Sequence, residues 1–532
     1  MLLNILILFC VVVFSCVLLN KISGRLGIPV LLCFILLGVL FGSDGILKIP
    51  FENYSMAESI CSAALIFIMF YGGFGTSWKQ AKSTAPEAIL LSTAGVVLTA
   101  VLVALFCCAV FHMQFGMGLL IGSIVSSTDA ASVFSILRSR KLNLRYNSAS
   151  LLELESGSND PAAYMMTLIS ILVLQGNVTT DQILEMVILQ VGVGMICGAG
   201  IAAAAKWCLR KFDFREGSFD MIFMLGVAVL SYALPTAFQG NGYLSTYLCG
   251  ILLGNTRFSG KKNIVQFFNG FTSLMQMLIF FLLGLLSLPH RLPETAGISI
   301  GIAMFLTFVA RPVAVFALMI PFRKPLKQML LLSFSGLRGA AAIVFAMMAM
   351  GQVEIGDTIF HITFLIAVLS VLFQGSLLPF CARALDMIDD SDDVMKSFTD
   401  YTEEVPVRFI QIYIPEGHAW EGKTLQEVAL PPDLLVILIE RGREKLVPNG
   451  ETVLCPGDLL ILSAVTSGEI SDVQLSEMTA TVKNGYAGKR ISELEIPADE
   501  LVILMKRGKS VLIPRGNDEV LPGDVLVMNR LA

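Results

Sequence analysis

Long apolar runs occupy this sequence from its first residue to about residue 385. Runs of roughly 17–25 apolar residues have the length at which a helix crosses a ~30 Å hydrocarbon layer. The sequence therefore predicts an α-helical membrane protein with about 13 transmembrane helices, and the lipid bilayer is its surrounding partner. The predicted spans lie at about 1–20, 26–43, 57–75, 87–111, 117–137, 147–174, 182–205, 219–238, 242–256, 263–288, 297–320, 327–352 and 359–385.

The composition agrees with this prediction. Hydrophobic residues make up 55% of the chain and charged residues only 15%, whereas soluble domains are about 25% charged. A soluble enzyme and a nucleic-acid-binding protein are therefore not expected. The first run lacks a basic leader and a small-residue cleavage site, so we interpret it as a retained span. The 11 cysteines are scattered without a CxxC spacing, which supports neither disulfides nor zinc.

Lysine and arginine gather in alternate loops between the spans, and an excess in short loops marks the cytoplasmic side. We therefore expect the N-terminus outside, everything after the last span inside, and a location in the plasma or inner membrane. The basic loop residues of one side are Lys21, Arg25, Lys79, Lys82, Arg138, Arg140, Lys141, Arg145, Lys206, Arg210, Lys211, Arg215, Arg257, Lys261, Lys262, Arg323, Lys324 and Lys327, against Lys48 and Arg291 on the other.

The sequence changes character near Asp386, from apolar runs to an acidic connector and then to short strand-like runs. A stretch at 420–462 recurs at 486–528, with an offset of 66 residues between Arg441 and Arg507. Such a constant offset indicates a duplication. We expect a transmembrane domain at 1–386, a linker at 387–406 and two small α+β domains at 407–465 and 466–532. Each should contain a short helix, a strand, an R-G turn, a second strand, and a P-G-D turn before a last strand.

Ionisable residues inside the spans are few, and such residues are costly in hydrocarbon unless they serve a function. Those singled out near the middle of a span are Asp129, Glu153, Glu155, Asp160 and Arg338. Asp129, Asp160 and Arg338 each lie near the midpoint of their own run, which places them near the bilayer midplane, where transporters bind their substrates.

The span at 147–174 carries two polar faces, because residues four apart share one face of a helix. Ser156 precedes Asp160 by one turn, and this face offers a hydroxyl and a carboxylate to a cation. Glu155 and Asn159 form the other face, on which Glu155 could meet Arg338. Two alternatives without ion binding stay open. The charged groups could form purely structural pairs, and the polar groups could only join helices through hydrogen bonds. Glu153 lies nearer the cytoplasmic end and could simply be solvated.

Two spans are interrupted near their middles by small and polar residues, at 126–128 and at 335–339. The two spans are seven apart, and an odd offset reverses the direction of crossing. Broken helices in corresponding positions predict inverted repeats, with spans one to six and eight to thirteen as the two halves. Pro161 removes a backbone donor directly after Asp160, so carbonyls there can turn toward an ion.

The residues around these positions resemble the monovalent cation:proton antiporters of the NhaP-like type, the CPA1 group. The resemblance covers roughly 1–390 and rests on Thr128-Asp129, on E-S-G-S-N-D-P at 155–161, and on S-G-L-R-G at 335–339. It implies an ion and proton antiporter, a homodimer and crossed broken helices.

The same resemblance implies the roles of individual residues. Asp160 would be the main carboxylate that exchanges ion and proton, Asn159 its partner, and Asp129 a second carboxylate. Thr128 and Ser156 would complete the oxygen shell of the monovalent cation. Glu155 and Arg338 would form the structural charge pair. Asn159 in place of a second aspartate implies electroneutral exchange, and no cofactor is implied.

The tail at about 407–530 resembles tandem RCK-C (TrkA-C) domains, which often follow antiporters that move potassium. The resemblance therefore favours K⁺ exchange for H⁺ regulated by the tail, with Na⁺ exchange on the same fold as the alternative. It also allows cyclic di-AMP as a regulatory ligand, while dinucleotide binding is not expected because no GxGxxG is present. Two rival classes are a ligand-gated channel, which would need a filter, and a transport-dead sensor, which would need no midplane carboxylates.

Overall fold

The computed structural model divides into two compact units, residues 1–404 and 405–532. The predicted linker at 387–406 contains the division, but most of it lies outside the described residues. So do several basic loop residues, among them Arg138, Arg140 and Lys141. The structure describes residues 10–388 and 407–531 apart from 20, 22–28, 50, 52, 130–131, 134–135, 138–141, 143, 177–178, 213–218, 257, 259–260, 429, 431–433, 443, 466–472, 482–484, 495, 497–499, 508–509, 513 and 515.

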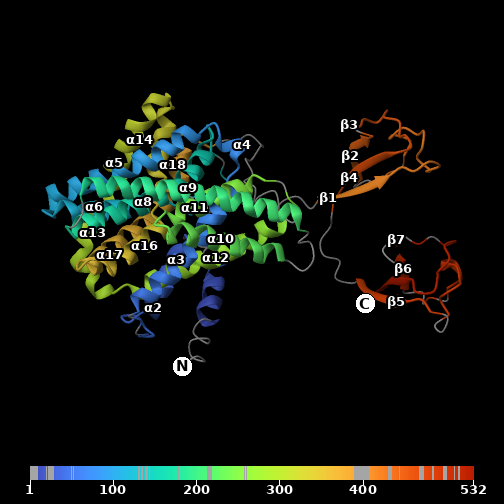
Figure 1. Ribbon diagram of the computed structural model, residues 1–532, viewed down its shortest axis with the longest axis horizontal. Helices are drawn as coiled ribbons and strands as arrows, with labels where there is room; N and C mark the ends of the chain where they lie inside the picture. The colour runs from blue at the N-terminus through green and yellow to red at the C-terminus, as the bar shows by residue number, and fades with distance from the viewer. Residues whose placement is uncertain are drawn as a thin grey trace. The chain divides into compact units, whose positions relative to one another are not determined.

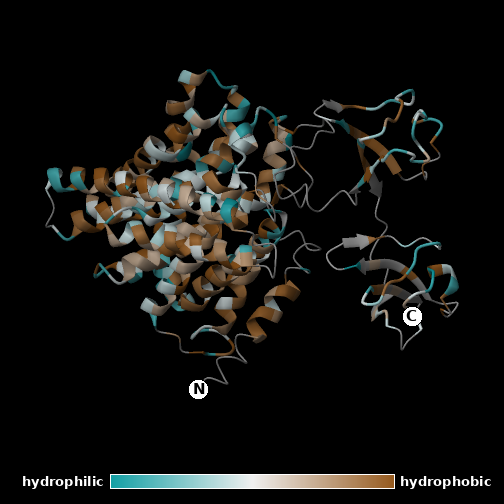
Figure 2. Ribbon diagram, turned by 45° about the vertical axis from the view of Figure 1, so that its right-hand side comes forward, coloured by the Kyte–Doolittle hydropathy of each residue, from teal (hydrophilic) through white to brown (hydrophobic). Residues whose placement is uncertain are grey.

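The first unit is a helical bundle (Figure 1) in which apolar residues dominate most helices (Figure 2). Within the described residues, 7 helices are long and apolar enough to cross a membrane, and five shorter apolar helices accompany them. Its labelled helices are α2 (Val30–Phe41), α3 (Tyr54–Gly75), α4 (Trp78–Ala81), α5 (Ala85–Phe111), α6 (Phe115–Ile124), α8 (Ser148–Leu174), α9 (Thr180–Lys211), α10 (Phe219–Ala237), α11 (Gly242–Gly254), α12 (Lys261–Leu286), α13 (Leu292–Phe305), α14 (Arg311–Met319), α15 (Leu326–Phe334), α16 (Ala340–Met350), α17 (Gly356–Leu369) and α18 (Ser376–Ala384).

Each predicted apolar run contains helix in its described part, but several runs are not continuous α-helices. A π-helical turn, η2 (Leu306–Ala310), joins α13 to α14, and a second one, η4 (Ser370–Gly375), joins α17 to α18. The predicted breaks are also present, between α6 and Asp129 and between α15 and α16. The sequence patterns predicted these two breaks but not the π-helical turns.

Glycines let pairs of helices approach to backbone contact. A Cβ atom added at Gly73 of α3 would lie 2.3 Å from the Tyr247 carbonyl oxygen of α11, and one at Gly250 of α11 would lie 2.3 Å from the Phe70 oxygen. Small residues at such crossings maximise packing where helices gain nothing from water exclusion. The close contact fixes α3 against α11, and both helices line the cavity described below.

The second unit contains two four-stranded antiparallel sheets of the same topology. The first has the order β1-β4-β2-β3 and the second β5-β8-β6-β7. The strands are β1 (Val407–Tyr413), β2 (Leu434–Arg441), β3 (Glu444–Leu446), β4 (Asp458–Val465), β5 (Val473–Thr479), β6 (Glu500–Arg507), β7 (Ser510–Leu512) and β8 (Val525–Leu531).

The duplication predicted from the sequence is present in the strand registers. Val407 pairs with Val465 in the first sheet, and Val473 pairs with Leu531 in the second, each 66 residues further on. The α+β prediction was too rich in helix: among the described residues of the tail, the half that contains the second sheet has a one-turn helix at Ile491–Glu493, and the half that contains the first sheet has only turns at the corresponding place. Turn hydrogen bonds, such as Gln426 N to Gly450 O, take the place of helical ones there.

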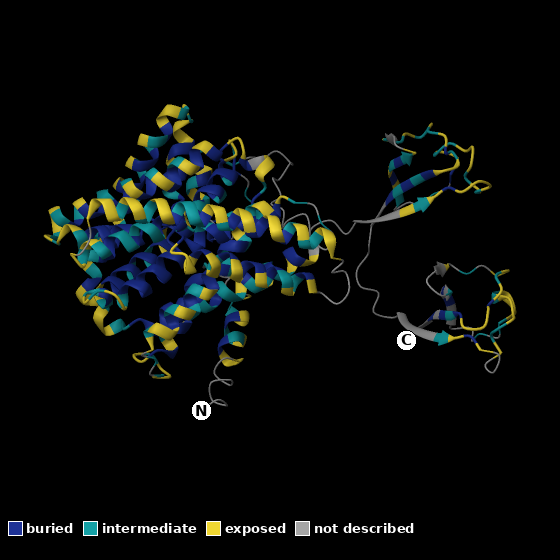
Figure 3. Cartoon of the chain, viewed as in Figure 1, coloured by how far each residue is buried: buried dark blue, intermediate teal, exposed yellow. Residues whose placement is uncertain are grey.

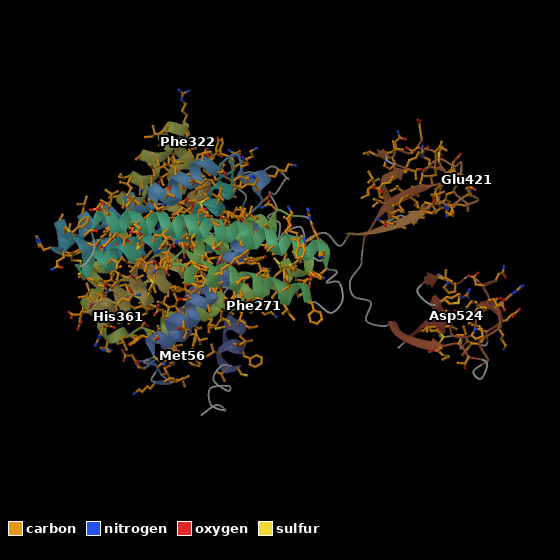
Figure 4. All side chains as sticks on the ribbon, in the orientation of Figure 1. Met56, Phe271, Phe322, His361, Glu421 and Asp524 are labelled. Carbon is orange, nitrogen blue, oxygen red and sulfur yellow. The ribbon has the colours of Figure 1, made fainter. Side chains whose placement is uncertain are left out.

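In each sheet, an arginine–aspartate ion pair joins the ends of two neighbouring strands. Arg441 donates from Nε to Oδ1 and from Nη2 to Oδ2 of Asp458, both at 2.8 Å, and Arg507 binds Asp524 in the same way (Figure 4 labels Asp524). The second nitrogen also donates to a carbonyl, Val453 O or Glu519 O. The Asp458 and Asp524 side chains are 0% and 3% exposed. Hydrogen bonds from the guanidinium groups lower the pKa of both carboxyl groups.

These lowered pKa values predict how the stability of the tail depends on pH. The ion pairs stabilise the tail above the ordinary carboxyl pKa of about 4, and this stability is lost as the pH falls through the lowered pKa values. Asp458→Asn should cost about 1.5–3 kcal/mol at neutral pH, the range for hydrogen bonds to charged groups. It should also flatten the acid limb of a melting-temperature profile of the isolated 405–532 fragment. Glu451→Gln, at an exposed turn, is the control, and an unchanged acid limb in Asp458→Asn would contradict the assignment.

Candidate functional site

The two helix breaks meet each other in the middle of the bundle. The Asp129 amide donates to the Leu337 carbonyl at 2.8 Å, which joins the two non-helical segments through their backbones. A Cβ atom at Gly339 would lie 2.2 Å from the Asp129 carboxylate. Only glycine therefore allows the Asp129 side chain to lie against the second break. Non-helical backbone is tolerated at membrane depth where protein surrounds it.

The Asp129 carboxylate also begins the helix that follows it. The Ser132 amide donates to Asp129 Oδ1 at 3.2 Å and the Ser132 hydroxyl donates to Oδ2 at 2.5 Å. An aspartate accepting from the amide three residues later is an N-cap, and Ser132 and Val133 are helical. The carboxylate is thus oriented by its own chain while remaining partly exposed.

Three side chains of α8 hold the first break through four hydrogen bonds. The Ser127 hydroxyl donates to Asp160 Oδ1 at 2.5 Å. Asn159 Nδ2 donates to Thr128 Oγ1 at 2.6 Å, its Oδ1 accepts from the Thr128 amide at 3.4 Å, and Ser156 Oγ donates to the Thr128 carbonyl at 2.6 Å. The structure therefore brings together all five residues predicted to bind the ion, and it adds Ser127, which the sequence reasoning named only as part of the break.

A cavity of about 400 Å³ reaches both carboxylates. Asp129 and Asp160 are partly exposed in its wall, whereas Asn159 is completely buried behind it (Figure 3 shows how buried residues fill the bundle). Glu153 lines the same cavity. Its remaining polar wall consists of Ser127, Thr128, Ser156, Asn269, Thr272, Ser273, Gln276, Tyr71 and Tyr247. The cavity thus presents hydroxyl and amide groups and three carboxylates, a surface suited to a hydrated or partly dehydrated cation.

The predicted ion pair between Glu155 and Arg338 is not the one that the structure contains. Glu155 is paired with Arg311 of α14, Oε1 to Nη2 at 2.5 Å, rather than with Arg338. The two side chains are only 1% and 4% exposed. Arg311 is the single charged residue of the predicted span 297–320, a signal that the search for midspan charges missed. The rotation of that helix toward α8, which the pattern alone does not specify, decides which arginine reaches Glu155.

Arg338 has a different task at the crossing. Its Nη1 donates to the Ser127 carbonyl at 2.8 Å, and its amide donates to the Ser370 hydroxyl at 3.0 Å. The Ser127 carbonyl lies just past the C-terminal end of α6, where unpaired carbonyls carry partial negative charge and attract a cation. Arg338 therefore links the first break to the second, and η4 to both.

Comparison with known proteins gives one match for each unit. Residues 10–384 match the family described as sodium/hydrogen exchanger, transmembrane, and residues 409–472 and 475–528 each match the TrkA-C domain. The predicted resemblance is thereby confirmed for both parts of the chain.

Individual relatives agree. The chain is 36% identical over 368 residues to the K(+)/H(+) antiporter NhaP of Alkalimonas amylolytica, covering 69% of this chain and 64% of that protein, so that it spans just under two thirds of this relative. It is 33% identical over 456 residues to the K(+)/H(+) antiporter NhaP2 of Shewanella oneidensis, covering 84% and 78%. The fold matches the structure of the sodium proton antiporter MjNhaP1 from Methanocaldococcus jannaschii at pH 8, with TM-score 0.63, 24% identity, and coverage of 72% of this chain and 99% of that one.

The Glu155–Arg311 pair predicts strong energetic coupling. Glu155→Gln and Arg311→Met should each destabilise the detergent-solubilised protein by about 3–5 kcal/mol, because each leaves a buried charge without its partner. The double variant should lose less than the sum, with a coupling on the order of 0.5–3 kcal/mol. Thermal unfolding followed by size-exclusion chromatography measures this. The matched cycle uses Arg338→Met with Glu155→Gln, and an equal or larger coupling there would contradict the pairing with Arg311.

Proposed function

Because this chain belongs to the sodium/hydrogen exchanger family, we propose that it exchanges a potassium ion for a proton across a membrane. Membership makes the chain a multi-spanning cation and proton transporter and not an enzyme. The observation that carries the proposal is that Asp129 of the first break and Asp160 of α8 share one cavity at the crossing of the two breaks.

Asp160 is the exchanging group in this proposal. Its carboxylate oxygens bind either a proton or the cation, so the two substrates compete for the same atoms and exclude each other. Asp129 supplies the second charged ligand. The Thr128 and Ser156 oxygens already accept or donate within the crossing, so they set the position of the backbone as much as they contribute oxygens to the cation.

Exchange is electroneutral in this proposal because one carboxylate trades one cation for one proton. Asn159, the neighbour of Asp160, is an amide that holds Thr128 and binds no proton at physiological pH. The buried pair Glu155–Arg311 keeps its charges fixed on both sides of the cycle, which leaves Asp160 to change state.

Potassium is supported by two observations. The relatives at 33% and 36% identity carry the name K(+)/H(+) antiporter, and two TrkA-C domains follow the transmembrane unit. Sodium/proton exchange is the second candidate, because the structural neighbour is titled a sodium proton antiporter. A carboxylate and hydroxyl site can suit either ion through small changes of cavity size.

The wider organisation belongs to the same proposal. We place the N-terminus outside and the tail in the cytoplasm of a cell membrane, with thirteen spans in two inverted repeats and two chains in a homodimer. The tail regulates exchange in response to a ligand, for which cyclic di-AMP is the candidate. The crossing of the breaks through Asp129 and Leu337 supports the repeat, and the charge distribution of the loops supports the orientation.

The first test removes the exchanging group. Asp160→Asn keeps the side-chain volume but cannot trade a proton for a cation, so exchange in proteoliposomes should fall to the level of protein-free liposomes while the melting temperature changes little. Asp44→Asn, a carboxylate in a loop outside the cavity, is the control and should retain exchange. Normal exchange by Asp160→Asn would refute the assignment.

The second test identifies the ion. Acid-loaded proteoliposomes containing a pH dye are challenged in turn with potassium, sodium, rubidium and lithium. Potassium and rubidium should collapse the gradient whether or not a membrane potential is clamped, as electroneutral exchange requires. A response confined to sodium and lithium would replace the potassium assignment with the sodium candidate, and no response to any cation would support the sensor reading.

A further inference from the structure

A second cavity, of about 490 Å³, lies at the crossing and shares no residue with the wall of the ion cavity. Its lining is almost entirely apolar and comes from α13, η2, α15, α17, η4 and α18 together with Arg338. Arg338 and Ser370 are buried at its inner end, 2% and 5% exposed. Met304, Phe308 and Phe373 form its rim and are 57%, 67% and 57% exposed.

Both π-helical turns contribute to the lining of this cavity. Leu306, Thr307 and Phe308 belong to η2, and Ser370, Phe373 and Gln374 belong to η4. A π-helical turn inserts an extra residue into an α-helix and is found most often at functional sites. Two such turns facing one cavity within the same described unit are a second, independent sign that the cavity has a purpose.

The position of the cavity rim along the spans indicates which part of the bilayer surrounds it. Phe308 is the middle residue of the predicted span 297–320, and Phe373 is next to the middle of 359–385. A rim halfway along two spans lies near the centre of a ~30 Å hydrocarbon layer, where the bilayer consists of acyl chains and not of headgroups.

Two polar side chains of the lining, Ser370 and Gln374, are engaged in hydrogen bonds within the protein. Ser370 Oγ accepts from the Arg338 amide and donates to Gln374 Oε1 at 2.5 Å, and Gln374 Nε2 donates to the Phe334 carbonyl at 3.4 Å. Apart from Thr307 and the buried Arg338, the guest therefore meets a mostly hydrocarbon surface. Burying a charged or strongly polar guest in such a place would be costly.

We propose that this cavity binds the acyl chain of a membrane lipid. The terminal part of the chain lies between η2 and η4 and rests against Ser370, whose hydroxyl holds the Arg338 amide. Since Arg338 also donates to Ser127, a bound chain contacts the same hydrogen-bonded network that positions the Asp160 partner. Occupancy therefore restrains the crossing and changes the exchange rate; this second consequence rests on the proposed function, whereas the binding does not.

The experiment uses the full-length protein in liposomes of phosphatidylcholine that carries a diazirine near the end of one acyl chain. After illumination, labelled peptides are identified by mass spectrometry, a readout that needs no transport activity. Labelling should concentrate on the peptides containing Met304, Phe308 and Phe373. Ala303→Phe places a ring in the cavity wall and should lower this labelling several-fold.

The matched control is Val309→Phe, on the same helix, 42% exposed and outside the cavity lining; it should leave the labelling unchanged. Leu377→Trp, elsewhere in the lining, fills the cavity independently if Ala303→Phe fails to fold. Labelling spread evenly over exposed residues such as Ile188 and Ile196, unaffected by either filling variant, would overturn the proposal. So would efficient disulfide formation between two Phe308→Cys chains, because a second copy would then cover the cavity.

Discussion

The structure depends on the backbone groups that two helices release when they stop in the middle of the bundle. Hydrocarbon supplies no hydrogen bonds, so each released amide or carbonyl must find a partner in the protein. The Asp129 amide donates to the Leu337 carbonyl, and the Ser127 carbonyl accepts from Arg338. The amide and the carbonyl of Thr128 both form hydrogen bonds with side chains of α8. The polar residues of the site are thus required twice, by the fold and by the chemistry, and they lie where they do because the breaks need them.

The two arginines share the electrostatic work at this place. Arg311 neutralises Glu155 through a direct contact, while the Arg338 side chain donates to the Ser127 carbonyl. The two arginines and one glutamate around the crossing carry a net positive charge, which favours negative charge nearby. Asp129 and Asp160 lie beside this region, in the wall of the cavity.

Much of this arrangement could be predicted from the sequence because hydrocarbon imposes strict rules. Charged residues stand out in apolar runs, which is why Asp129, Asp160 and Glu155 were predicted, although Arg311 was missed; small polar residues such as Ser126 to Thr128 indicate a break. The identity of Glu155's partner could not be predicted, since it depends on how α14 is rotated toward α8. The π-helical turns could not be predicted for another reason: the composition of L-T-F-V-A and S-V-L-F-Q-G does not differ from that of ordinary apolar helix. In the tail, the repeat predicted the shared registers, but turn hydrogen bonds replaced the expected helix.

The contact between Gly339 and Asp129 has a consequence for the variation that the gene can tolerate. Every amino acid that a single base change can substitute for glycine carries a Cβ atom, and at this position that atom would fall 2.2 Å from the carboxylate. Gly336, three residues earlier in the same break, has 3.2 Å to its nearest neighbour, the Arg311 side chain, and so leaves room for alanine with a small adjustment. Two glycines of one short segment therefore differ in what they can become: any side chain at Gly339 would push against Asp129 of the first break, whereas Gly336 has room for a methyl group.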